Sequence, residues 1–287
     1  MQRFCRFGIW ALLLLAPGVS RASLFFSADL SANLLTYDAV GNLLFTTPLI
    51  VSPGTAILSL AVQPGTGTLF GAADAPGSTS LVSIDPNTGA VTDLGTMFSA
   101  AGSAPGSVAS ATVSTGLAFT ADGNLYVGAI GSAGGGVICG AGNIIDCSGS
   151  LYSVNPLDGA VSLIGGVDVG GALAGASGLV LYNGDGTVNS IDPSDGSATQ
   201  LAHLSFPTSY SFTVGPAGLY YLIDSSGNLD TLDGSFSLTT GPALAGSPRP
   251  GVLAFSPGVT GFTPEPASLG LLGAGIAGLV AFRKYLR

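Results

Sequence analysis

Positive charge is almost absent from the middle of this 287-residue chain. Between Ser23 and Thr263 there is no lysine and no glutamate, and Arg249 is the single basic residue, whereas fifteen aspartates lie in the same stretch. The other six basic residues lie in the two end segments. Such an anionic surface repels the phosphate backbone of nucleic acids, so we expect no nucleic-acid partner.

Residues that carry catalysis are scarce as well. The only histidine, His203, lies in a strand-like segment, and no nucleophile elbow accompanies it. The glycines 134–136 lack the Lys-Ser or Lys-Thr pair of a phosphate-binding loop. The only tryptophan, Trp10, lies near the N-terminus, and five tyrosines fall in predicted strands, where packing explains them: Tyr126, Tyr152, Tyr182, Tyr220 and Tyr221. We therefore expect a protein that is not an enzyme.

Aspartates are plentiful, and two facing carboxyl groups can cleave a glycosidic bond. Most of them, however, lie in predicted turns, where hydrogen bonding to the local backbone explains them: Asp85, Asp122, Asp158, Asp185, Asp192 and Asp195. Four are less clearly turn residues, and no pairing follows from their spacing: Asp168, Asp224, Asp230 and Asp233. Calcium accepts carboxylates, but the body has no glutamate to complete a calcium loop. We predict no cofactor, and structural calcium stays open with no ligands assigned.

The N-terminal segment has the pattern of a signal for export. Arg3 and Arg6 precede the apolar stretch 9–16, and a small-residue site predicts cleavage after Ala22, so we interpret residues 1–22 as a signal peptide.

Cys139 and Cys147 enclose a glycine-rich loop. In an exported protein this pair predicts a disulfide, because two thiolates with no histidine nearby make a poor zinc site.

A strand–turn–strand unit recurs along the body. Its three clearest copies cover residues 80–91, 150–161 and 188–199, and each centres on Asp or Asn, then Pro, two variable residues and Gly. Alternating apolar residues predict the strands, and the Pro and Gly positions predict the turn. A second strand pair precedes each copy, which makes four short antiparallel strands per unit. That is the size of a propeller blade.

The sequence predicts an all-β fold, a β-propeller of about five blades. Four blades are expected near residues 56–97, 115–166, 167–204 and 209–245. The fifth is split: residues 251–258 match a first strand, and residues 24–51 match the other three, so the two ends close the ring. An irregular β-sandwich or an open stack of hairpins is the alternative.

The body resembles bacterial propellers whose blades carry a strand–Asp-Pro-x-x-Gly–strand signature, related to quinoprotein-type and lactonase-like repeats. The resemblance covers most of residues 24–258 and implies a fold without an activity. Residues 99–114 are expected as a flexible loop. Residues 131–149 are expected as a hairpin insertion, which is either a tolerated surface loop or a recognition element.

The C-terminal segment has the pattern of a second targeting signal. Residues Pro264, Glu265 and Pro266 precede an apolar stretch over 267–282, and a basic cluster follows: Arg283, Lys284 and Arg287. The segment is expected to enter the membrane with its cations on the cytoplasmic side. It resembles the PEP-CTERM sorting tail, which implies recognition by an exosortase at the inner membrane of a Gram-negative bacterium. Tyr285 and Leu286 interrupt the basic end.

We thus expect a signal peptide (1–22), a propeller-like domain (23–262) and a sorting segment with a transmembrane helix (263–287). The expected function is that of an exported, non-catalytic component of the cell envelope or extracellular matrix, linked to exopolysaccharide or biofilm. Its partners would be exosortase, the inner membrane, and polysaccharide or surface proteins. The alternative is a secreted, metal-dependent hydrolase or lactonase, and a third option is a purely structural spacer.

Overall fold

The computed structural model describes residues 23–99, 108–109, 113–130, 149–167, 171–175, 177–183, 186–204, 211–215, 218–224, 226–246, 248 and 252–256. The chain divides into two units, one formed by Met1–Arg21 with Val259–Arg287 and the other by Ala22–Gly258. All the described residues belong to the second unit. Cys139, Cys147 and the whole C-terminal sorting segment lie outside them, so the predicted disulfide and transmembrane helix stay predictions.

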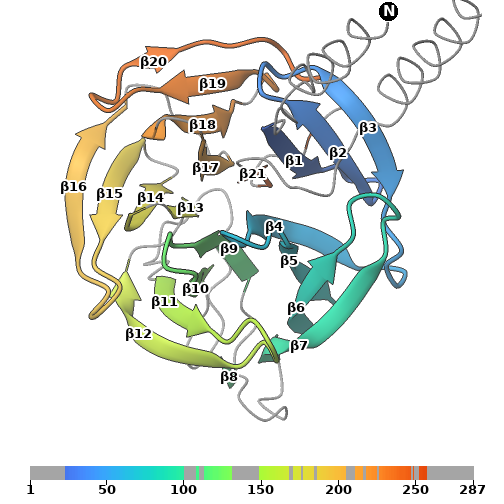
Figure 1. The fold of residues 1–287 in the computed structure, drawn as a ribbon. Helices are drawn as coiled ribbons and strands as arrows, with labels where there is room; N and C mark the ends of the chain where they lie inside the picture. The colour runs from blue at the N-terminus through green and yellow to red at the C-terminus, as the bar shows by residue number, and fades with distance from the viewer. Residues whose placement is uncertain are drawn as a thin grey trace, which may run out of the picture. The chain divides into compact units, whose positions relative to one another are not determined.

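Five antiparallel sheets form a ring, each with its strands ordered from the centre outward (Figure 1). Blade 1 contains β21 (Ala254–Ser256), β1 (Leu24–Ala28), β2 (Asn33–Asp38) and β3 (Leu43–Pro48). Blade 2 contains β4 (Ala56–Val62), β5 (Leu69–Ala75), β6 (Ser78–Ile84) and β7 (Val91–Ser99), with the short β8 (Val108–Ala109) parallel to its outer edge.

The other three blades have four strands each. Blade 3 contains β9 (Val113–Phe119), β10 (Leu125–Ile130), β11 (Gly149–Val154) and β12 (Val161–Val167). Blade 4 contains β13 (Gly171–Gly175), β14 (Leu179–Asn183), β15 (Thr187–Ile191) and β16 (Ala198–His203). Blade 5 contains β17 (Phe212–Val214), β18 (Tyr220–Ile223), β19 (Leu229–Leu232) and β20 (Leu238–Thr239). The predicted all-β propeller is confirmed.

Blade 1 joins the two ends of the ring. β21 pairs with β1 in the register Leu24 to Ser256, Phe25 to Phe255 and Phe26 to Ala254. Two further bonds connect the same parts of the chain: the Ser27 hydroxyl donates to the Val252 carbonyl at 2.6 Å, and the Tyr37 hydroxyl donates to the Ala245 carbonyl at 2.7 Å. The predicted split blade is therefore confirmed, and the open stack of hairpins is wrong.

The core lies between neighbouring blades, where large side chains meet. The Phe70 and Phe119 rings are 5.3 Å apart across blades 2 and 3, and the Phe25 and Tyr221 rings are 4.7 Å apart across blades 1 and 5. Phe25 is fully buried. Burying one such ring contributes about 1.5–3 kcal/mol, and an aromatic pair adds about 0.5–1.5 kcal/mol. The alternating apolar residues of each strand thus face the adjacent blades.

The repeated turns adopt one geometry. In each copy the Gly amide donates to the carbonyl of the Asp or Asn four residues before it: Gly89 to Asp85 at 2.8 Å, Gly159 to Asn155 at 2.9 Å, and Gly196 to Asp192 at 2.8 Å. The glycine φ angles are +71°, +71° and +78°. Only glycine adopts this left-handed region without steric cost, which explains the fixed place of Gly in the unit.

These turns also join the blades. A β-carbon on Gly89 would lie 1.9 Å from the Pro48 carbonyl oxygen in blade 1. The same closeness recurs at the next two junctions, between Gly95 of β7 and the Asp158 carbonyl (1.8 Å), and between Gly165 of β12 and the Asp195 carbonyl (2.3 Å). Each turn therefore packs its backbone against the outer strand of the preceding blade, where a side chain would not fit.

The segment 99–114, expected as a flexible loop, is not a loop throughout. Within it the structure places β8 and the first residues of β9, and β8 extends the sheet of blade 2. Residues 131–148, which form most of the expected insertion, lie outside the described residues.

Candidate functional site

The innermost strands of all five blades lie around the centre of the ring (Figure 1). Residues from all five blades line one cavity. Its empty volume is about 320 Å³, including space open to solvent. The lining residues come in runs of two or three from each blade: 60–62, 117–119, 173–175, 213–214 and 253–255.

The chemistry of this cavity comes from the backbone. Its side chains are those of Leu, Ala, Val and Phe, and Thr213 is the one polar side chain among the residues that line it. The surface that it exposes is nonetheless polar. The axial edges of the innermost strands have no neighbouring strand, so their N–H and C=O groups face the axis. Such a lining can bind water or a small polar molecule, but it offers no acid or base.

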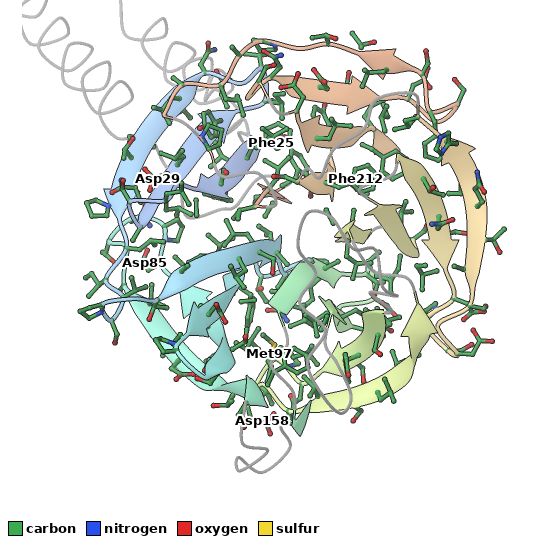
Figure 2. The ribbon with its side chains drawn as sticks, turned by 180° about the vertical axis from the view of Figure 1, so that it is seen from behind. Phe25, Asp29, Asp85, Met97, Asp158 and Phe212 are labelled. Atoms are coloured by element: carbon green, nitrogen blue, oxygen red, sulfur yellow. The ribbon has the colours of Figure 1, made fainter. Side chains whose placement is uncertain are left out.

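The carboxylates expected in turns are held by those turns. Asp85 accepts the Asn87 amide at 2.9 Å and the Thr88 hydroxyl at 2.8 Å. The hydrogen bond from the Thr88 side chain, followed by that from the Asn87 amide, lowers the pKa of Asp85. Figure 2 shows Asp85 and Asp158 toward the outside of the ring, away from the central cavity. The turn prediction is confirmed for Asp85, and comparable bonds hold four others: Asp122, Asp158, Asp192 and Asp195. Asp185 lies outside the described residues.

Two aspartates that sequence reasoning did not assign to turns are turn residues as well. Asp224 accepts the amides of Ser226 and Asn228, each at 2.8 Å. Asp233 accepts the amides of Ser235 and Ser237, each at 2.9 Å. The sequence signal for these two turns was weaker, because neither contains the proline found in the three clearest copies of the repeat. Asp168 lies outside the described residues.

Asp230 differs from the other aspartates because it is buried within β19, with 3% of its surface exposed. One carboxylate oxygen accepts the Gly241 amide at 3.0 Å. Burial, and to a lesser degree the charge of Asp224, raises the pKa of Asp230. Its position two residues before Leu232, on the face that packs into the core, was not recognised from the sequence. It does not line the central cavity.

Among the residues that the structure describes, no three His, Cys, Asp or Glu side chains come together as metal ligands would. His203 ends the outer strand β16 and is exposed, opposite Thr187 in the register.

Three rings stack near one edge of blade 5. The Phe212 and Tyr220 rings are 5.2 Å apart with planes 7° apart, and the Tyr220 and Phe236 rings are 5.6 Å apart with planes 18° apart. Phe212 is buried, whereas Tyr220 and Phe236 are partly exposed. Phe236 has a φ of +58°, which costs a bulky residue on the order of 1–3 kcal/mol. We call these residues the aromatic stack, and Figure 2 labels its inner member, Phe212.

The ring of five sheets, four with four strands and one extended by β8, defines a five-bladed β-propeller. Residues 262–284 match the PEP-CTERM protein-sorting motif, a range that includes Pro264, Glu265, Pro266, Arg283 and Lys284, while Arg287 lies beyond it. The chain is therefore an exported substrate of an exosortase, with a membrane-anchored precursor, of the type found in Gram-negative bacteria. Within the described residues there is no helix with the length and hydropathy of a membrane span.

Comparison with solved structures gives matches at low sequence identity. A chain of the nidogen/laminin complex matches with a TM-score of 0.49 at 10% identity, over 81% of this chain and 98% of that one. Regucalcin, a calcium-binding protein from Agrobacterium tumefaciens, matches with a TM-score of 0.48 at 15% identity, over 82% and 74%. A Bacteroides thetaiotaomicron protein of unknown function matches with a TM-score of 0.38 at 12% identity, over 76% and 64%. No curated protein matches the sequence.

Proposed function

We propose that this protein is a non-catalytic propeller of the cell envelope or extracellular matrix that binds exopolysaccharide of the biofilm type. The observation that carries the proposal is that most of the described aspartates accept hydrogen bonds from their own turns, in a chain that carries a sorting signal. Hydrogen bonds to the ionised form lower the pKa of a carboxyl and so make it a weaker base toward a substrate.

The negative charge of the body favours a partner that is itself uncharged. The described residues contain twelve aspartates and neither lysine nor arginine, so an anionic polymer would be repelled at short range. A neutral polysaccharide meets no such barrier, and the many serine and threonine hydroxyls of the surface can hydrogen bond to it.

The test is retention of the natively exported protein on exopolysaccharide isolated from the same culture. The purified protein is mixed with the polymer and sedimented, and the bound fraction is measured with and without a chelator. We expect retention that the chelator leaves unchanged, together with no release of reducing sugar. Absence of any retention would contradict the proposal.

The same samples separate the hydrolase or lactonase alternative. That alternative predicts turnover of a glycoside or lactone that stops when EDTA is added and returns with a divalent cation. Mass spectrometry of the same preparation gives both termini and the redox state of Cys139 and Cys147.

A further inference from the structure

One turn of the ring breaks the rule that the others follow. The turn between the third and fourth strands holds a glycine with positive φ in four blades, at Gly41, Gly89, Gly159 and Gly196. In blade 5 the corresponding residue is Phe236, whose amide donates to the Asp233 carbonyl at 2.9 Å. A bulky residue in this region is an outlier, and such outliers concentrate where a side chain has a special task.

The side chain of Phe236 completes the aromatic stack. Tyr220 lies between Phe212 and Phe236 with all three planes nearly parallel, so Phe236 is the last ring of the stack and one of its faces is turned away from Tyr220. Packing against the cluster that contains Leu204 and Leu232 stabilises the ring in this place. That packing leaves Phe236 partly exposed.

Polar groups flank the same ring. Ser235 and Ser237 are its neighbours in the turn, and both are exposed. The Ser235 hydroxyl donates to the Asp233 carboxylate at 2.7 Å, and this bond and the bonds from the two serine amides lower the pKa of Asp233. An ionised carboxylate is a strong acceptor for hydroxyl groups. The aromatic face of Phe236 therefore lies beside a turn that can form hydrogen bonds with a ligand.

We propose that Phe236, with Tyr220 behind it and Asp233, Ser235 and Ser237 beside it, binds one sugar ring of an uncharged polysaccharide. The inference rests on the proposed function and names its site. The C–H face of a pyranose lies on the phenyl ring and extends the stack by one member. The sugar hydroxyls donate to Asp233 and exchange hydrogen bonds with the serine hydroxyls. The shortage of cations directs the site away from uronate or sulfated polymers.

The experiment compares three variants of the natively exported protein. Phe236→Gly installs the residue that the other four blades carry at this place, and Phe236→Leu keeps an apolar side chain without a ring. Phe45→Ser is the control, because Phe45 is 56% exposed on the outer strand β3 of another blade. Binding to a soluble neutral glucan and to alginate is measured by affinity electrophoresis, and melting temperatures are recorded for all four proteins.

We expect wild-type protein and Phe45→Ser to bind the neutral glucan equally, and both Phe236 variants to bind it at least tenfold more weakly. Equal binding by the Phe236→Leu variant, with an unchanged melting temperature, would overturn the site while leaving the proposed function in place. Binding of alginate in preference to the neutral glucan by the wild-type protein would also overturn the site. Absence of binding to any polysaccharide by the wild-type protein, including the cell's own, would remove the proposed function itself.

Discussion

Gly95 and Gly159 lie backbone against backbone where blade 2 meets blade 3. A β-carbon on Gly159 would lie 2.6 Å from the Gly95 carbonyl oxygen, and one on Gly95 would lie 1.8 Å from the Asp158 carbonyl oxygen. The junction between these blades therefore depends on the absence of two side chains, as much as on the aromatic rings that fill its centre.

Replacement of Gly159 by alanine tests this junction. The φ of +71° and the clash with Gly95 both oppose a β-carbon, so we expect a loss of about 2–4 kcal/mol in the free energy of unfolding, measured with urea. Gly65→Ala is the matched control, because Gly65 has a φ of +82° and a β-carbon placed on it would have no atom within 4 Å. The control should lose about 1–2 kcal/mol. Equal losses in the two variants would mean that the junction itself contributes nothing.

Closure of the ring predicts a large effect at Phe25. This ring is fully buried and contacts Tyr221 of blade 5 and Phe255 of β21, at 4.7 and 5.1 Å between centroids. Phe25→Ala should lower the free energy of unfolding by about 3–5 kcal/mol, whereas the exposed Phe45→Ala should change it by less than about 0.5 kcal/mol. A small effect at Phe25 would show that blade 1 contributes little to closure.

A stabilising change is expected at Ala32. This residue has a φ of +58° in the turn after β1, where its carbonyl accepts the Leu49 amide at 2.8 Å. Glycine removes the strain of the left-handed conformation, at an entropic cost in the unfolded chain that is smaller. Ala32→Gly should therefore raise the free energy of unfolding by about 0.5–1 kcal/mol. A lower midpoint of urea denaturation than in the wild-type protein would contradict this account.

Asp230 predicts a specific pH dependence. Burial raises its pKa in the folded state above the value of 3.8 that it has in the unfolded chain. Its contribution to stability is therefore fully present below pH 3.8 and is lost as the pH rises through the higher folded pKa. Asp230→Asn keeps the oxygen that accepts the Gly241 amide and removes the ionisation. We expect the variant to gain stability relative to the wild-type protein as the pH rises from 3.8 toward neutrality.

The wild-type protein must be compared with Asp230→Asn because other aspartates also make stability depend on pH. Bonds from the turns lower the pKa values of Asp85, Asp192 and Asp233, so these residues stabilise the fold above the unfolded pKa and lose that contribution as the pH falls. Urea denaturation of both proteins over a pH series cancels this shared trend. A difference between them that does not vary with pH would contradict a raised pKa at Asp230.

Sequence reasoning located the blades because local chemistry repeats in each. Asp85, Pro86 and Gly89 adopt the geometry that those residue types favour, and the match of residues 251–258 to a first strand was enough to predict the split blade. The contribution of Gly95 and Gly165 could not be predicted, since a glycine inside a strand only weakens the strand signal. Their use becomes apparent once a neighbouring turn is in place.

The candidate site was harder to predict. Phe236 occupies a position where the pattern predicts glycine, so its turn lacked the usual signature and Asp233 was not assigned to a turn. Tyr220 was correctly expected to pack in a strand, but the stack depends on a diagonal contact with Phe212 and on a residue sixteen positions later. Sequence spacing does not report such contacts.

Because Leu24 is paired with Ser256, the ring begins and ends at one place, where other blades have the short loop between their first and second strands. Suppose that the two ends of the ring were joined by such a loop and the chain were opened within residues 63–68 instead. The same five blades would then follow one another in a new order along the sequence. We therefore expect this circular permutation to fold into the same propeller. In the sequence, the predicted signal peptide (1–22) precedes β1 and the matched sorting motif (262–284) follows β21, so neither segment interrupts a blade.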